Sequence, residues 1–177
     1  TSPLHINHAK TVANNNVINV GDNAKVKVNI ITVANSGGGY EAEANNNSAI
    51  ISGNAVVDGA VYVSDAHANV ANYKPEEGGK ATANNNIVTG KDNAKVTQWV
   101  QAGYTYSLIG NRASGITEAN DNVVNVKDNA SVASLFGARA KGYALNDTIT
   151  AKNNIVNIGD KATVEVVVPE DDDYDVY

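Results

Sequence analysis

Apolar and polar residues alternate along most of this chain, and short runs of asparagine, aspartate and glycine interrupt the alternation. In the segment from Ala13 to Val26, Ile18 and Val20 fall on one side of an extended strand. Turn residues occupy positions 21–23, and the alternation then resumes. Strand side chains point alternately to two faces, whereas a helix repeats every 3.6 residues, so this period predicts β-strands.

The same segment recurs four more times. The copies begin at Ala44, Ala83, Ala119 and Ala151, so successive starts lie 31, 39, 36 and 32 residues apart. Repeats of this length are typical of solenoids and propellers. A third alternating stretch, such as residues 40–44, leads into each next copy. Three strands per unit favour an all-β parallel β-helix, or β-solenoid, of about five rungs with three strands each. A propeller, which needs about four strands per blade, is the alternative fold.

One asparagine of each copy has the same parity as the inward-facing apolar residues, at the corner that leads into the first strand. Its side-chain amide both donates and accepts hydrogen bonds, so amides stacked at equal height can bond from rung to rung. We therefore predict a buried asparagine ladder, and the alternative is a row of solvated turn residues. The ladder residues are Asn16, Asn47, Asn86, Asn122 and Asn154.

The repeat pattern divides the chain into three parts. Residues 1–10 form a lead or partial rung, residues 11–168 form the solenoid, and residues 169–177 form an acidic C-terminal tail. The tail is expected either to be disordered or to cover the edge of the last rung. Within the longest repeat, Pro75 and Gly78 break any strand between residues 69 and 79, so that segment is predicted to protrude as a loop.

Charge and cysteine content limit the partners. The net charge is −6, but five of the 19 acidic residues lie in the tail, which leaves 14 acidic against 13 basic residues in the rest of the chain. Without a basic stripe, nucleic acid is not an expected partner. The chain has no cysteine, which excludes disulfides and cysteine-bound zinc. We expect no cofactor and no metal ion.

Several large residues fall at positions expected to face outward, where they would form a binding surface for a protein or a sugar. The alternative is that return loops fold over them as a satellite core. Three residues beyond the recurrent valine of the second strand come Asn29, Ala60, Trp99, Leu135 and Val167. Tyr62, Tyr104 and Tyr106 lie on the same stretches, and the predicted loop adds Tyr73, Lys74, Glu76 and Glu77.

Two patterns could indicate a metal site or a catalytic site. Asp22, Asp92, Asp128 and Asp160 would stack in a row that could hold calcium or serve a lyase, but their position favours ordinary turn use. His67 lies close to Ser64 and Asp65 in the sequence, in a setting unlike that of a catalytic triad, and is predicted to be a loop histidine. We predict no catalytic residue and no enzyme activity.

The repeats NNNVINVGDNAKV and NNIVNIGDKATV, together with return segments such as GGGYEAEA and GARAKGYALNDTITA, resemble the passenger region of Gram-negative type V autotransporters. The resemblance covers roughly residues 11 to 168. It implies a right-handed parallel β-helix that is exported across the outer membrane and displayed at the cell surface, with the translocator barrel outside this chain. The protease motif of one branch of the family, GDSGSP, does not occur.

These observations predict a structural and adhesive segment that binds a host-cell protein, a glycan or another bacterial surface. The alternative function is a carbohydrate-active β-helix enzyme, either a polysaccharide lyase or a hydrolase. The open edges of the terminal rungs also predict end-to-end self-association of the chain.

Overall fold

The protein is a stack of parallel β-strands. The computed structural model describes residues 10–70, 79–109, 115–142 and 147–174. These residues contain strands, turns and bends and no helix, so none of them forms a helix that could cross a membrane. The lead before Lys10, the loop residues 71–78 and the tail residues 175–177 lie outside the described part.

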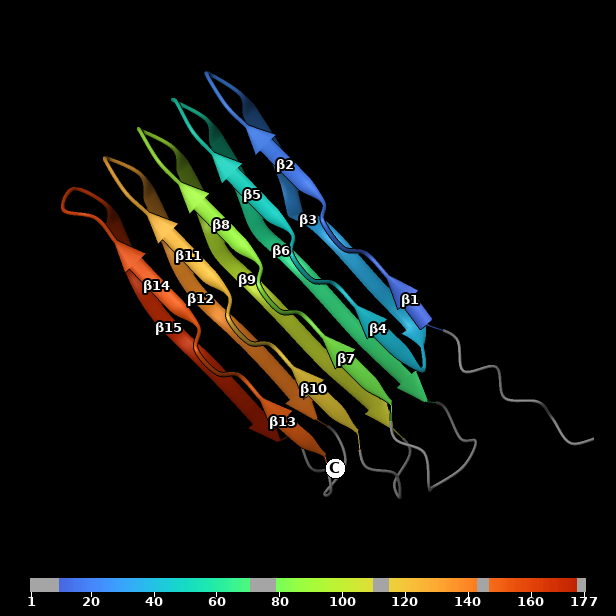
Figure 1. Cartoon of the computed structure of the whole chain (residues 1–177). Coiled ribbons are helices and arrows are strands. Elements are labelled where there is room, and N and C mark those ends of the chain that lie inside the picture. The colour runs from blue at the N-terminus through green and yellow to red at the C-terminus, as the bar shows by residue number, and fades with distance from the viewer. Residues whose placement is uncertain (1–9, 71–78, 110–114, 143–146, 175–177) are drawn as a thin grey trace, which may run out of the picture.

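Within the described residues, fifteen strands form three parallel sheets of five (Figure 1). The first sheet contains β1 (Lys10–Val12), β4 (Glu41–Glu43), β7 (Lys80–Thr82), β10 (Ile116–Glu118) and β13 (Thr148–Thr150). The second contains β2 (Val17–Val20), β5 (Ser48–Ile51), β8 (Ile87–Gly90), β11 (Val123–Val126) and β14 (Ile155–Ile158). The third contains β3 (Lys25–Gly39), β6 (Val56–Val70), β9 (Lys95–Ile109), β12 (Ser131–Gly142) and β15 (Thr163–Tyr174).

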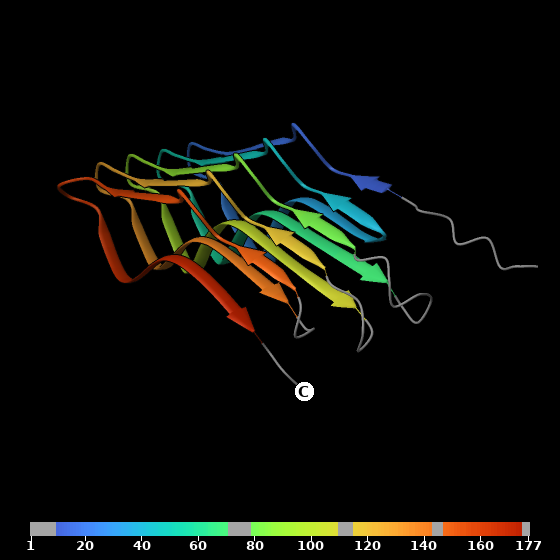
Figure 2. The same cartoon turned by 60° about the horizontal axis from the view of Figure 1, so that its bottom comes forward.

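Each rung takes one strand from each sheet, so β1, β2 and β3 form the first rung and β13, β14 and β15 the fifth. The predicted parallel β-solenoid of five three-stranded rungs is confirmed, and the propeller alternative is excluded. The two short strands of a rung follow one another on one side, while the long strand runs back on the other (Figures 1 and 2). The solenoid is therefore a flattened two-layer body.

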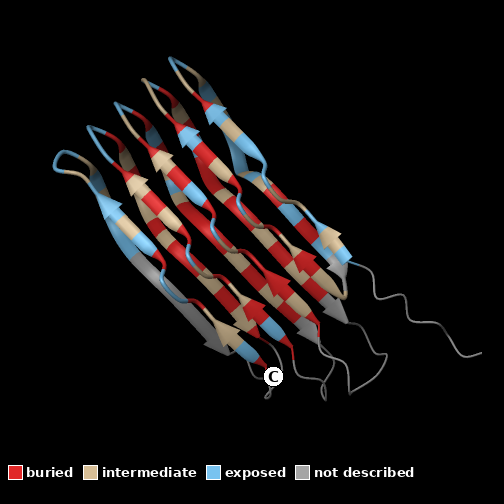
Figure 3. Cartoon of the chain, viewed as in Figure 1, coloured by how far each residue is buried: buried red, intermediate tan, exposed pale blue. Residues whose placement is uncertain are grey.

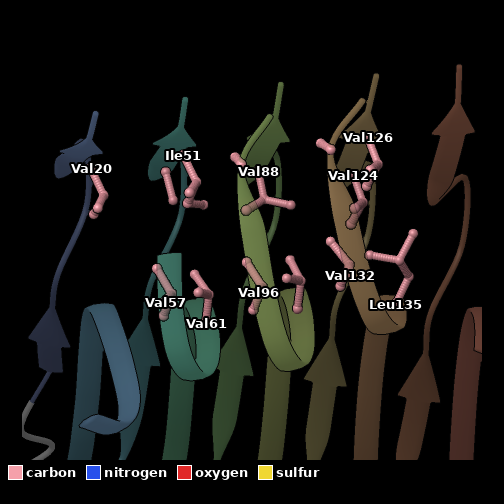
Figure 4. Close-up of a cluster of buried hydrophobic side chains, with 14 of the residues drawn as sticks. Val20, Ile51, Val57, Val61, Val88, Val96, Val124, Val126, Val132 and Leu135 are labelled. Carbon is pink, nitrogen blue, oxygen red and sulfur yellow. The ribbon is translucent and has the colours of Figure 1, made fainter. Parts of the chain in front are cut away.

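The interior has two regions of different thickness. Between the second sheet and the first part of the third sheet lie valine, isoleucine and leucine side chains, among them Val57, Val88 and Leu135 (Figure 4). Between the first sheet and the later part of the third sheet the buried apolar residues are almost all alanine, as at Ala66 and Ala81, and buried serine and threonine such as Thr105 and Thr117 lie in the same region. Small side chains let the two layers approach closely there. Buried positions run through the inner rungs, whereas the terminal rungs are more exposed (Figure 3).

Tight backbone turns form two corners of each rung. The middle residue of the asparagine run has a positive φ in every rung, for example 62° at Asn15 and 57° at Asn85. Asparagine and aspartate tolerate this left-handed conformation better than most other residues. At the second corner the same conformation occurs at Asp22, Asp92 and Asp128, and Gly53 adopts it in the second rung. The predicted turns at this second corner are confirmed.

The predicted asparagine ladder is present, and we call it the inner ladder. In each of the first four rungs, the backbone N–H and the side-chain Nδ2 donate to Oδ1 of the asparagine in the next rung, over 2.9 to 3.1 Å. Asn47, Asn86 and Asn122 are almost fully buried. The alternative of solvated turn residues is therefore wrong for these three positions.

Two further asparagine ladders run along the solenoid. The outer corner ladder contains Asn14, Asn45, Asn84 and Asn120, and Oδ1 of each accepts the backbone N–H of the next rung over 2.7 to 2.9 Å. The turn ladder contains Asn23, Asn54, Asn93 and Asn129, and Oδ1 of one side chain accepts from Nδ2 of the next over 3.0 to 3.1 Å. Both lie nearer the surface than the inner ladder.

Small residues of the third sheet make room for the inner ladder. A Cβ added at Gly103 would lie 2.7 Å from Nδ2 of Asn122 and 2.8 Å from the carbonyl oxygen of Ala83. The residues paired with Gly103 in adjacent strands are Ser64 and Ala138, which are also small and fully buried. The buried amides thus limit the size of the side chains across the layer.

The strand pairing continues into the acidic segment. The backbone of β15 pairs with β12 as far as Tyr174, so Arg139 lies beside Asp171 and Lys141 beside Asp173 in the register. The residues assigned to the tail from 169 to 174 are therefore part of the last strand.

We predict that Asn86→Ala lowers the free energy of unfolding by about 2–4 kcal/mol. It removes the acceptor of the buried Asn47 amide groups, and each orphaned buried group costs about 1–3 kcal/mol. Asn93→Ala in the exposed turn ladder is the matched control and should change it by less than about 0.5 kcal/mol. Urea unfolding followed by circular dichroism measures both. Equal losses would contradict the stabilising role of the inner ladder.

We predict that Gly103→Ala destabilises the protein by about 1–3 kcal/mol, because the new methyl group meets backbone that cannot move aside cheaply. Gly37→Ala is the control, since a Cβ there makes only ordinary contacts at 3.7 Å or more. Thermal unfolding of both variants compares them. A Gly103→Ala protein as stable as the control would show that the layers can separate at this position.

Candidate functional site

The outer face of the third sheet carries a cluster of aromatic rings. Tyr62 lies on β6, and Trp99, Tyr104 and Tyr106 lie on the neighbouring β9. All four are partly exposed, and the residues on either side of Tyr62, Tyr104 and Tyr106 are buried, as is Val100 next to Trp99. We call these four residues the aromatic face. All four belong to the binding surface predicted from the sequence, and the structure places their rings next to one another.

The rings of the aromatic face touch one another across the two strands. The ring centroids of Tyr62 and Tyr104 are 6.3 Å apart with planes inclined by only 16°. Trp99 lies 6.4 Å from Tyr62, and Tyr106 lies 6.0 Å from Tyr104. Aromatic pairs at 4.5–7 Å stabilise one another. The contacts hold the rings in fixed positions on the rigid sheet.

A histidine and a carboxylate join the aromatic face. His67 lies in β6, with its ring centroid 3.8 Å from that of Tyr106 and edge-on to Tyr104 at 6.1 Å. Its Nε2 pairs with Oδ1 of Asp65, and Nδ2 of Asn35 donates to the other carboxylate oxygen over 3.3 Å. The prediction of a loop histidine is wrong, because β6 continues past His67 to Val70. Residues two apart on one strand share a face, so His67 lies on the same face as Asp65.

The fourth rung adds positive charge to the same face. In the pairing of β12 with β9, Arg139 lies beside Tyr104 and Lys141 lies beside Tyr106. Phe136 lies beside Gln101. These residues of β12 were not predicted to belong to the binding surface, and neither were Asn35, Asp65 and His67. Their alternation was visible, but their positions relative to the aromatic rings depend on the register between rungs of unequal length.

Leu135 is not part of this surface, and its predicted outward position is wrong. Its side chain is fully buried and lies among the core valines (Figure 4). Val132 pairs with Val96, and Leu135 pairs with Val100. Two residues lie between Val132 and Leu135 in β12, but three lie between Val96 and Val100 in β9. The pairing shifts register there, so counting three residues from the valine reaches an outward position in β9 and an inward one in β12.

The other residues of the predicted binding surface lie in different environments. Ala60 is fully buried at the irregular pairing between β3 and β6, where a Cβ at Gly59 would lie 1.9 Å from the carbonyl oxygen of Val28. Val167 pairs with the inward Leu135 and is 41% exposed because β15 is the edge strand of its sheet in the described structure. Asn29 is exposed. Tyr73, Lys74, Glu76 and Glu77 lie outside the described residues.

The aspartate row serves the turns. Oδ2 of Asp92 accepts the backbone N–H of Gly53 over 3.0 Å, and Oδ2 of Asp128 accepts that of Asp92 over 3.2 Å. Within the described part of the chain, no three carboxylate or histidine side chains gather as a metal site. Asp92 is also twelve residues from Tyr104 along an extended strand, on the order of 30–40 Å, so the turn carboxylates do not converge on the aromatic face.

Comparisons with known proteins add no relative. No protein-family model, no curated protein and no solved structure matches this chain. The stacked fold and the geometry of the aromatic face therefore carry the functional argument.

Proposed function

We propose that this chain is a surface-displayed structural and adhesive segment of a bacterial autotransporter passenger. Its role is binding without chemistry, and its partner is a glycan or protein of a host cell or of another bacterium. The repeat motifs named above support the autotransporter assignment, and the parallel β-solenoid is the fold that such a passenger requires. The proposal places the chain outside the cell, beyond the outer membrane.

The aromatic face is the observation that carries the binding role. Its side chains combine an apolar ring with a polar tip, which suits a surface that must stay hydrated until a partner arrives. The C–H faces of a sugar ring pack against aromatic rings, while hydroxyl groups need donors and acceptors at the edge. Asn35 is exposed and supplies such groups beside the Asp65–His67 pair, which lies next to Tyr104 and Tyr106. This combination favours a glycan among the proposed partners.

The solenoid contributes rigidity to binding. Parallel strands on both layers fix the backbone beneath the rings, so little conformational entropy is lost when a ligand is bound. A repeated core also lets the outer face vary without changing the fold, since outward residues make few contacts with the interior. The rod acts as a support and the aromatic face makes the contact.

We predict that the Trp99→Ala, Tyr104→Ala double variant loses at least tenfold in affinity, since interface aromatic residues commonly contribute more than about 1.4 kcal/mol. Binding of the purified chain to a glycan array and to cultured host cells provides the measurement. Ile87→Ala is the matched control, because Ile87 is 44% exposed on the outer face of the second sheet. Absence of saturable binding by the wild type, or unchanged binding by the double variant, would refute the proposal.

A further inference from the structure

The two ends of the solenoid differ at the ladder positions. The outer corner ladder and the turn ladder have asparagine in the first four rungs. In the fifth rung both positions are occupied by lysine, at Lys152 and Lys161. Both lysines are exposed. Both replacements of asparagine by lysine lie in the last rung. Their effect depends on whether the asparagine of each ladder bonds to the preceding rung or to the following one.

The oxygens of both ladders hold the following rung. In the outer corner ladder, Asn120 Oδ1 accepts the backbone N–H of Lys152 over 2.9 Å. In the turn ladder, Asn93 Oδ1 accepts from Nδ2 of Asn129 over 3.1 Å. A lysine side chain has three donors and no acceptor. The fifth rung therefore has no side-chain oxygen at either position with which to hold a sixth rung.

The inner ladder has the opposite direction and is complete in the fifth rung. Its Oδ1 atoms accept from the preceding rung, and Asn154 does so for the backbone and side chain of Asn122 over 3.0 Å. The last rung thus keeps the asparagine that bonds backward and lacks the two that bond forward. Lys152 and Lys161 lie in the corners of the last rung, between its strands, and lysine charges at a terminal edge are a common means of preventing further strand pairing.

The first rung has the complementary arrangement. Among the described residues nothing donates to Asn16 Oδ1 and nothing accepts from the backbone N–H of Asn14, although the equivalent groups are bonded in every later rung. The inward Ile18 and Val26 are only partly buried, whereas their partners Ala49 and Val57 in the second rung are fully buried. A rung placed before β1 would satisfy both polar groups and bury the apolar ones.

We propose that the edge of the first rung is a docking surface for one further β-solenoid rung of this pattern, and that Lys152 and Lys161 close the opposite edge. The partner is a parallel rung whose forward edge has asparagine at the positions of Asn14 and Asn23, as the first four rungs of this chain have. The edge of the first rung can accept such a rung, whereas the edge of the fifth rung lacks the two asparagines that would bond to one. End-to-end association of unmodified copies is weak for this reason.

Restoring asparagine at the fifth rung tests the proposal. K152N/K161N changes two exposed side chains, so its fold is not at risk. The variant has asparagine at the same ladder positions as the first four rungs, and its copies should join head to tail at a concentration at least tenfold lower than the wild type. Sedimentation velocity over a range of concentrations measures the association of both proteins. Identical association of variant and wild type would overturn the proposal.

A mixing experiment tests the direction of docking. Ile18→Lys places a charge on the inward side of the first rung, where a docked rung would bury it but an open edge leaves it access to water. The I18K/K152N/K161N protein should stay monomeric alone and form a one-to-one complex with wild type. I18K alone, mixed with wild type, is the control and should bind at least tenfold more weakly. A complex of equal strength with the control, or none with the triple variant, would refute the directional docking.

Discussion

Hydrogen bonding between identical asparagines in successive rungs is the constraint on which the rest of this structure depends. Asn47, Asn86 and Asn122 are buried, so each amide group needs a partner that water cannot supply. The same residue in the adjacent rung supplies it only if both rungs hold the corner at equal height. The corner is therefore fixed, and the repeat lengths, which range from 31 to 39 residues, vary elsewhere along the rung.

The buried amides also explain where the large residues lie. Side chains opposite the inner ladder must be small, as at Ser64, Gly103 and Ala138, and the alanine core beyond them brings the two layers close together. In this part of the rung the buried side chains of the third sheet are small. Tyr104 and Tyr106 consequently take the alternate, outward positions of β9. A thin interior and an aromatic exterior are two consequences of one packing requirement.

The described stack of rungs has unpaired strand edges at both ends, and the residues at the ladder positions differ between the two ends. The first rung keeps the groups that a preceding rung would use, and the fifth replaces the forward-bonding asparagines by Lys152 and Lys161. A solenoid is stabilised by contacts between neighbouring rungs, so its terminal rungs are the least stable and need polar caps. In our proposal, this difference of two side chains decides which end of the stack accepts a further rung.

The sequence by itself determined the solenoid, its five rungs, the turns and the inner ladder, because these follow from the period of alternation and from residues repeated at one position. The tertiary structure decided which outward residues meet. Leu135 turned inward because β12 has one residue fewer than β9 before the same core position. His67 and Asp65 joined Tyr104 and Tyr106 because the register between β6 and β9 sets them side by side. Alternation fixes the face of a residue within one strand, but only the pairing of strands fixes its neighbours.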